Sequence, residues 1–333
     1  MGFDSYLIPR VHHCYTGQSF TRDGGPEFAP DGFSVDFEAA EVETFLRRAS
    51  QDNRPFFLYY SISPPHCPLA DAPEDVLRLY SPAAIPLRPN VDPAKPLPNE
   101  DYWLRVYRYD FRHYSLRLPY ADQLPDGYGL RQLIAEYCGL TTWMDSAVGR
   151  MLTALDAAGL SEDTIVLFTS DHGDNLGSHG LVQKGTPNDE SIRIPLVVRW
   201  PGRIPAGRVC TRQVASLVDL APSLLSLAGC EVPDAMQGMN LAPVMNGTAD
   251  RSPRPYAVVE MGHGTAVRSA DGMVFARFLD GGRALSDTPE QVFEDAADPY
   301  QLANLAAGPL PSWASEACER LAEWDIATPW MTE

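Results

Sequence analysis

The sequence predicts an α/β protein with a mostly parallel sheet sandwiched by helices, followed by a small C-terminal α+β subdomain. Helical and strand-like segments alternate along the first part of the chain. The strand-like segments are apolar on both faces, as expected for a parallel sheet that helices cover. Beyond about residue 252 the segments instead resemble antiparallel strands. We therefore expect an α/β domain over 1–250 and a small antiparallel-sheet subdomain over 251–333.

The first helix and the first strand follow directly from local patterns. Residues 35–51, VDFEAAEVETFLRRASQ, place apolar side chains on one helical face, namely Phe37, Ala40, Phe45 and Ala49. Residues 55–63, PFFLYYSIS, are almost continuously apolar and aromatic. A short run of this kind predicts a buried strand.

The middle of the chain repeats this alternation. Residues 133–155 predict a long helix, and Gly159 supplies its C-terminal stop. The apolar residues at helical spacing are Leu133, Tyr137, Leu140, Met144, Val148, Leu152 and Leu155. Buried strands are expected at 164–170, TIVLFTS, and at 194–200, IPLVVRW. Another helix is expected over about 217–228.

Two further regions differ from the alternating pattern. Six prolines between Pro82 and Pro98 predict an irregular insertion over about 81–130, which then continues with a run rich in Tyr, Trp and Arg. This insertion could be a pocket wall or a structural flap. Near the C-terminus, TAVRSADGMVFARF predicts two antiparallel strands that turn at Asp271-Gly272, and a last helix is expected near 312–326.

Composition excludes several classes of function. The chain has 333 residues and a formal net charge of −18, which argues against a nucleic-acid-binding surface. No run of 18 or more apolar residues is present, so we expect no membrane span. The six cysteines are scattered and form no C-x-x-C pair, which favours free thiols over a disulfide framework.

The densest group of ionisable residues is the stretch FTSDHGDNLGSHGLVQKG, residues 168–185. Asp171, His172 and Gly173 follow a predicted strand, and ligands of α/β sheets bind beyond the carboxyl ends of strands. A carboxylate oxygen and an imidazole nitrogen suit a divalent cation, and Gly173 lets the chain leave strand geometry. Position alone leaves open a polar turn in which Asp171 caps the next segment.

Two other residues are candidates for binding an anion. Lys184 follows the Asp171–His172 pair closely in sequence, although a single lysine is more often a solvated surface residue. His66 follows a predicted strand and two prolines in SISPPHCPLA. A hydrogen-bonded turn histidine is the alternative there. His179 also lies in the stretch, and its pattern assigns it no role.

Four stretches, in this order, carry a resemblance to a known family: RPFFLYYSISPPHCPL, YCGLTTWMDSAVGRMLTALDAAGLSEDTIVLFTSDHGDNLGSHGLVQKGTPNDESIRIPLVVRWPG, VASLVDLAPSLLSLAGCEVPDAMQG and VFEDAADPYQLANLA. Together they resemble the sulfatase family of the alkaline-phosphatase-like superfamily over nearly the whole chain except 81–130. The resemblance implies that Asp171 and His172 are metal ligands, usually for Ca²⁺ or another divalent cation. It also implies that Lys184 holds the substrate's sulfate. His66 would hold the sulfate or protonate the leaving oxygen.

The chain departs from the family pattern at its start. It contains no strand with two consecutive Asp, no C/S-x-P-x-R motif and no K-x-H segment. In the family, the Cys or Ser of that motif becomes the catalytic formylglycine. The resemblance therefore predicts no nucleophile in this chain and places the formylglycine in a missing N-terminal segment.

The resemblance implies that the full-length form hydrolyses a small-molecule or saccharide sulfate ester by a metal-assisted formylglycine mechanism. The alternatives are a phosphonate monoester or phosphodiester hydrolase of the same superfamily and an inactive remnant. A complementing N-terminal half is one partner that the resemblance allows. Localisation stays open: the chain as it stands would be cytoplasmic, and a signal peptide upstream of Met1 would make it periplasmic or secreted.

Overall fold

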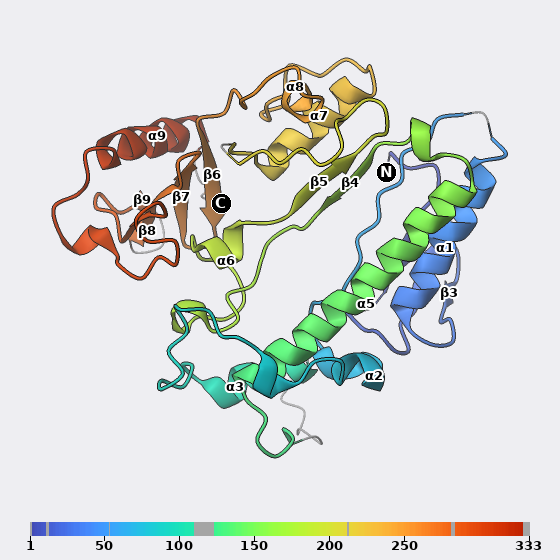
Figure 1. Cartoon of the computed structure of the whole chain (residues 1–333), viewed down its shortest axis with the longest axis horizontal. Coiled ribbons are helices and arrows are strands. Elements are labelled where there is room, and N and C mark those ends of the chain that lie inside the picture. The colour runs from blue at the N-terminus through green and yellow to red at the C-terminus, as the bar shows by residue number, and fades with distance from the viewer. Residues whose placement is uncertain are drawn as a thin grey trace. The chain divides into compact units, whose positions relative to one another are not determined.

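The computed structural model describes residues 2–10, 13–52, 54–109, 123–211, 213–280 and 284–328. The chain forms two compact units, one of residues 1–88 with 94–162 and one of residues 89–93 with 163–333. Figure 1 labels most of their helices and strands. The two units meet at residues 162/163. The separate domain boundary that the sequence analysis expects near residue 250 remains a prediction.

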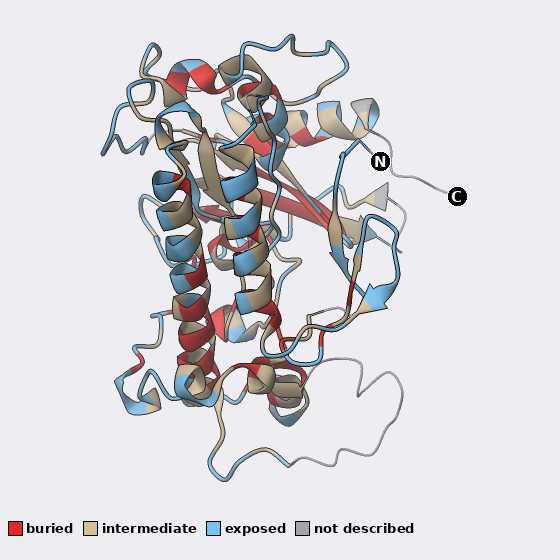
Figure 2. Cartoon of the chain, turned by 90° about the vertical axis from the view of Figure 1, so that its right-hand side faces the viewer, coloured by how far each residue is buried: buried red, intermediate tan, exposed pale blue. Residues whose placement is uncertain are grey.

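Two helices that the sequence predicts form the core of the first unit. They are α1, Ser34–Ala49, and α5, Leu130–Ala157, and they pack against each other. The short helix α2, Glu74–Leu77, also packs on α5, where a Cβ built on Gly139 would lie 2.2 Å from the Val76 carbonyl oxygen. Figure 2 shows the buried residues along one side of α5. Those of both helices include Val35, Ala39, Val42, Leu46, Leu133, Leu140, Trp143 and Ala147.

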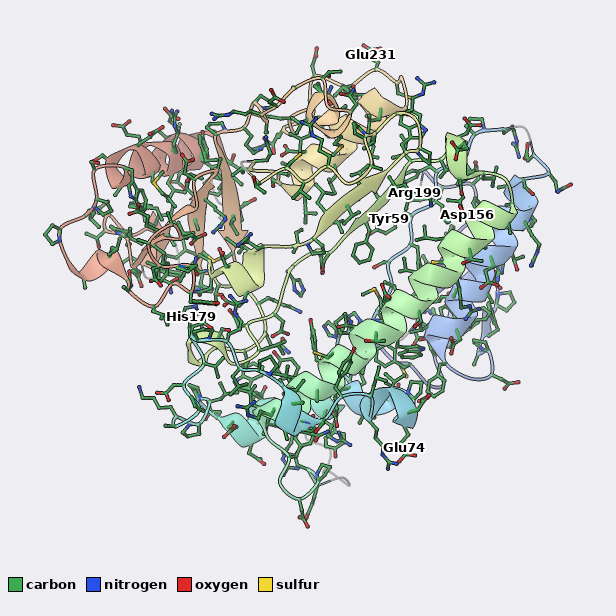
Figure 3. The ribbon with its side chains drawn as sticks, in the orientation of Figure 1. Tyr59, Glu74, Asp156, His179, Arg199 and Glu231 are labelled. Carbon is green, nitrogen blue, oxygen red and sulfur yellow. The ribbon has the colours of Figure 1, made fainter. Side chains whose placement is uncertain are left out.

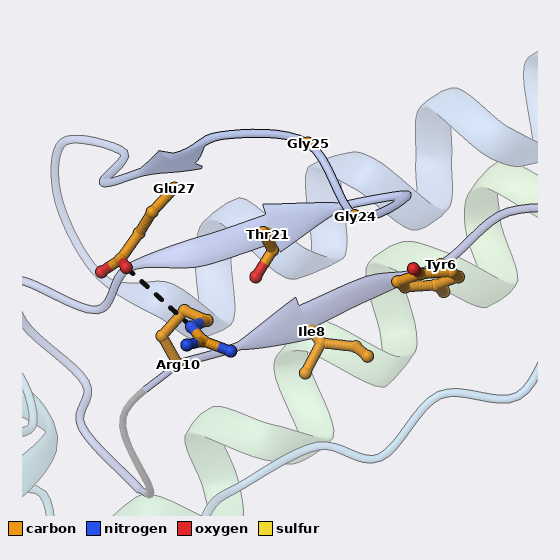
Figure 4. A pocket seen from close by; sticks show the side chains of 7 residues that line it. All are labelled: Tyr6, Ile8, Arg10, Thr21, Gly24, Gly25 and Glu27. Atoms are coloured by element: carbon orange, nitrogen blue, oxygen red, sulfur yellow. Dashed lines mark ion pairs between the residues drawn. The ribbon is translucent and has the colours of Figure 1, made fainter.

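A small antiparallel sheet begins the first unit. Its strands pair in the order β1, Leu7–Pro9, β2, Phe20–Arg22, and β3, Glu27–Phe28. Figure 4 shows an open groove on this sheet, where Arg10 and Glu27 lie 3.9 Å apart with 57% of each side chain exposed. Because these two charges face each other across an open surface, the groove offers no unpaired charge to a ligand.

The insertion expected to be irregular contains a helix. The prolines do give short turns, the 3₁₀ helix η2 at Pro82–Ala84 among them, but α3 spans Glu100–Tyr109 after the last proline. Glu100 and Asp101 occupy its first turn, where acidic side chains are favourable. Its inward residues Leu104, Val106 and Tyr107 are buried. The amphipathic pattern therefore decides the structure of this part of the insertion, and the preceding prolines do not. The rest of the aromatic run, 110–122, lies outside the described residues.

The strand expected at 55–63 is not formed, and this prediction is wrong. The segment is extended, and within the described chain no backbone hydrogen bond joins residues 55–62 to another strand. One side faces α1, where Phe56 meets Phe45 with ring centroids 5.4 Å apart and the Tyr60 hydroxyl donates to Glu38 Oε2 over 2.7 Å. The alternate residues Phe57 and Tyr59 lie on the other side of the segment and are 67% and 70% exposed. A strand needs a hydrogen-bonding neighbour, and local apolarity cannot supply one.

The next two predicted strands are present in the second unit but pair antiparallel. They are β4, Val166–Thr169, and β5, Leu196–Arg199, in register from Val166 opposite Arg199. No parallel ladder occurs among the described residues. The strands are also less covered than expected, because Leu196 and Val197 are 36% and 58% exposed. The helix expected after them appears as η5, Leu217–Asp219, continued by α7, Leu220–Leu227.

The C-terminal sheet confirms the antiparallel pattern predicted beyond residue 252. Its strand order is β10-β8-β7-β6, with β9 added to β8. Gly272, at a φ of 83°, lies in the turn between β7 and β8, as expected. Helix α9, Ala314–Ala327, packs on this sheet through Ala317 and Leu321. The strands span Tyr256–Met261, Gly264–Ser269, Met273–Asp280, Ala284–Leu285 and Gln291–Glu294.

Two further short helices belong to the second unit. They are α8, Ala242–Met245, and the 3₁₀ helix η6, Leu305–Ala307. Over the described ranges no helix is both long enough and apolar enough to cross a membrane.

Candidate anion and metal site

The Asp171–His172 pair lies where the chain leaves β4. The Ser170 hydroxyl donates to the His172 carbonyl oxygen over 2.8 Å, which closes a tight turn directly after the strand. The Gly173 N–H then donates to the Ser191 carbonyl oxygen over 2.8 Å, so the turn rests on helix α6, Asp189–Ile192. Both predicted ligands therefore project from the loop end of a strand, as the sequence predicts.

Hydrogen bonds orient the two side chains toward each other. His172 Nδ1 lies 2.8 Å from the Gly173 carbonyl oxygen, so this ring nitrogen carries a proton and donates to it. His172 Nε2 is 3.3 Å from Asp171 Oδ2. Burial opposes ionisation of Asp171, but the adjacent His172 ring, the His172 N–H and the Ser170 hydroxyl outweigh it and hold the pKa of Asp171 below its ordinary value. The pair is thus an anionic oxygen beside an imidazole nitrogen.

These two residues fit part of a metal shell. Among the described residues no group of three or more His, Cys, Asp or Glu is arranged to hold an ion. A carboxylate and one imidazole offer at most three donor atoms, whereas Ca²⁺ takes about 6–8 ligands. An ion at Asp171 and His172 therefore needs most of its ligands from elsewhere.

Lys184 lies on the same loop and is exposed. Its neighbour Gln183 is fixed, because both the backbone N–H and the side-chain Nδ2 of buried Asn175 donate to the Gln183 carbonyl oxygen over 2.8 Å. The loop thus holds the backbone next to Lys184 and leaves the ammonium group accessible to an anion.

His66 belongs to the first unit, whereas Asp171, His172 and Lys184 belong to the second. Its ring stacks on that of His13, with centroids 3.7 Å apart, and its Nδ1 lies 2.7 Å from the Cys67 carbonyl oxygen. The Tyr15 hydroxyl donates to the His66 carbonyl oxygen over 2.6 Å. Asp71 accepts from the Thr16 N–H over 2.9 Å and holds the segment that carries Tyr15.

Sequence reasoning missed His13 and Tyr15 as neighbours of His66, and Asn90 as a neighbour of His179. Each of them reaches its partner from a distant part of the chain, so periodicity and spacing carry no signal for them. For His13 the sequence shows one signal, a pair of adjacent histidines in the chain's opening segment.

Comparison with known proteins decides the family. A family model described as Sulfatase matches residues 12–230, which is more than half of the chain. The chain belongs to the sulfatase family. Its relatives include the ulvan-active sulfatase of Formosa agariphila, which is 29% identical over 92% of this chain and 55% of that protein. The multifunctional alkaline phosphatase superfamily protein PehA of Trinickia caryophylli is 31% identical over 72% of this chain and 46% of that protein.

Solved structures show the same fold. A structure described as a complex with its substrate D-glucosamine-2-N,6-O-disulfate has a TM-score of 0.74 and 24% identity, over 98% of this chain and 76% of that one. The phosphonate monoester hydrolase of Agrobacterium radiobacter has a TM-score of 0.62 and 25% identity, over 88% of this chain and 60% of that one. The predicted alkaline-phosphatase-like α/β fold and the membership of a family of sulfuric ester hydrolases are therefore confirmed. The chain spans about half the length of the curated relatives it matches.

Proposed function

We propose that this chain supplies one half of a sulfatase active site, and that the whole enzyme hydrolyses sulfate esters of a small molecule or a saccharide. The observation that carries the proposal is the Asp171–His172 pair, with its imidazole nitrogen 3.3 Å from the carboxylate oxygen, on the same loop as Lys184. This loop lies within the region that matches the sulfatase family. One relative named for ulvan and one structure described as a complex with a disulfated glucosamine support a sulfated saccharide as the substrate.

Each residue then has a defined task. Lys184 binds the sulfate oxygens, since an exposed ammonium on a fixed backbone can offset the charge that develops there. His66, which belongs to the first unit, would bind sulfate or donate a proton to the leaving oxygen, as the family resemblance implies. Asp171 and His172 would hold a divalent cation, calcium by family resemblance, and such an ion when bound neutralises anionic charge.

The nucleophile comes from outside these 333 residues in this proposal. The chain contains no C/S-x-P-x-R motif, and ester cleavage needs a nucleophile as well as charge stabilisation. We propose that a segment bearing formylglycine and the first pair of metal ligands completes the site. It would either precede Met1 in the same gene product or be a separately encoded N-terminal half.

The test uses the product of the whole gene, read upstream of the Met1 codon, assayed on an aryl sulfate. Lys184→Ala should lower kcat/KM by about 10²–10³-fold, the usual loss for a group that stabilises transition-state charge. Lys95 is the chain's other lysine, and Lys95→Ala is the matched control that should leave kcat/KM unchanged. Equal effects of the two substitutions would overturn the role of Lys184.

The same assays distinguish two alternative functions. The likeness to PehA and to a phosphonate monoester hydrolase favours a phosphodiester or phosphonate substrate as the second candidate. A phosphodiester rate well above the aryl-sulfate rate would establish it. The absent C/S-x-P-x-R motif favours an inactive remnant, which a lack of turnover on both substrates by the whole gene product would establish.

A further inference from the structure

Asn90 is a buried amide surrounded by acceptors from distant parts of the second unit. Its Nδ2 lies 3.0 Å from His179 Nε2, 2.8 Å from Glu190 Oε1 and 3.1 Å from the Tyr300 carbonyl oxygen. Only 7% of Asn90 is exposed. The residues on either side of 89–93 belong to the first unit, yet this short segment packs within the second. Asn90 thus joins this proline-rich segment to three separate parts of the second unit.

The partner of Asn90 has an unusual backbone. His179 has a φ of 58°, in the left-handed region that non-glycine residues rarely adopt, and it lies in the 3₁₀ helix η4, Ser178–Gly180 (Figure 3). Such a conformation persists only where the surroundings hold it. Asn90 supplies two of the contacts that do so, because its carbonyl oxygen accepts from the His179 N–H over 2.8 Å and its amide meets the His179 ring. Glu190 Oε2 lies 3.7 Å from the same ring nitrogen.

Glu190 connects this contact to the candidate site. Its side chain, 6% exposed, accepts from Asn90 at the tip of the 171–185 loop. The next residue, Ser191, accepts from the Gly173 N–H at the base of the loop. Between tip and base, Asn175 holds Gln183, the residue before Lys184. The loop is therefore fixed at its base, at its neck and at its tip, and Asn90 forms the last of these three attachments.

We propose that Asn90 is a positioning residue: by fixing His179 and Glu190 it sets the loop on which Lys184 meets an anion. A neutral amide suits this place, because it donates to a ring nitrogen and a carboxylate at once. A carboxylate at position 90 would instead repel Glu190. The inference rests on the proposed anion role of Lys184, and its test separates the two.

The test compares Asn90→Ala with Asn304→Ala in the chain as it exists. Asn304 is a matched control in the same unit, since its Oδ1 accepts from the Val292 and Ala306 N–H groups and its Nδ2 donates to the Glu290 carbonyl oxygen. Asn90→Ala should speed hydrogen exchange of the Gly177 and His179 amides by about 10-fold or more, the effect of losing a buried hydrogen bond. It should also weaken binding of inorganic sulfate about 10-fold, as loss of a supporting partner commonly does. Asn304→Ala should do neither.

His179→Asn is the second variant, because Asn tolerates left-handed backbone and loses the ring. It should reproduce the Asn90→Ala effects, and the double variant should lose no more than either single one. If Asn90→Ala merely lowers Tm and speeds exchange uniformly, as a structural residue would, the proposal is overturned. If the wild-type chain does not bind sulfate, the role of Lys184 fails, and the exchange comparison still decides the role of Asn90.

Discussion

Gly173 packs against the carbonyl oxygen of Glu190 so closely that a Cβ built on Gly173 would lie 2.0 Å from that oxygen. Any larger residue must push the loop away from α6 and break the hydrogen bond from the Gly173 N–H to Ser191. Gly173→Ala should therefore lower the free energy of unfolding by about 1–3 kcal/mol, the usual cost of overpacking. Urea denaturation followed by circular dichroism measures it.

The control for this substitution is Gly149→Ala in α5. Gly149 is exposed, and a Cβ there would have no neighbour within 4 Å. In a helix interior this change should raise stability by up to about 1 kcal/mol. If both variants shifted the urea midpoint in the same direction, the close contact at Gly173 would not be the cause.

Burial of the Glu38 carboxyl group predicts that stability falls as pH rises. Burial raises the pKa of Glu38 from its ordinary value of 4.5 to about 7, although the Tyr60 hydroxyl opposes this. A raised carboxyl pKa stabilises the folded state fully below about pH 4.5, and this contribution is lost as pH rises through about 7. With about 1.4 kcal/mol per pKa unit, the free energy of unfolding should decrease by up to about 3 kcal/mol over that window.

Glu38→Gln removes the titrating group and should flatten this part of the profile. Tyr60→Phe removes the hydrogen bond that lowers the pKa of Glu38, so the fall should extend to higher pH. Chemical denaturation from about pH 4.5 to about pH 8 tests both. A profile that Glu38→Gln leaves unchanged would assign the pH dependence to other groups.

Local patterns were sufficient for α1, α5 and the C-terminal sheet, because their apolar spacing reflects the face that each element buries. They failed at 55–63, where Phe57 and Tyr59 are as apolar as a buried strand requires but no strand among the described residues pairs with the backbone. They also missed α3, because the density of prolines before it obscured an amphipathic helix that begins just after the last one.

The candidate site, like the fold, was only partly visible in the sequence. The pair of Asp171 and His172 with Gly173 was visible in sequence because one tight turn contains the whole arrangement. The contacts of His66 and His179 were not visible, because Tyr15, Asn90 and Glu190 reach them through the tertiary fold. The sequence therefore proposes residues for the chemistry, and the structure adds neighbours that contact two of them, His66 and His179.

Arg254 and Asp219 form a buried ion pair whose loss should destabilise the second unit. Asp219 is fully buried; its Oδ2 accepts from Arg254 Nε and from the Ser216 N–H, both over 2.9 Å, and its Oδ1 accepts from the Met239 N–H over 2.7 Å. Arg254→Ala leaves this carboxylate without its cation, which should cost about 3–5 kcal/mol. Thermal and urea unfolding measure the loss.

The control for that prediction is Arg54→Ala. Arg54 also pairs with a carboxylate, that of Asp52, but 84% of its side chain is exposed. Water screens such a pair, so no measurable change in Tm is expected. A drop in Tm equal to that of Arg254→Ala would mean that burial of the Asp219 pair contributes nothing.

The two-residue metal site predicts weak binding. Because Asp171 and His172 supply at most three donor atoms of the 6–8 that Ca²⁺ prefers, the chain by itself should bind Ca²⁺ with a dissociation constant on the order of 1 mM. Titration of Ca²⁺ followed by the NMR signals of the His172 ring measures it. Asp171→Asn should abolish the shift, and Asp145→Asn, which changes an exposed carboxylate on α5, should not. A dissociation constant below about 10 μM would show that further ligands, which the described residues do not bring to this pair, complete the shell.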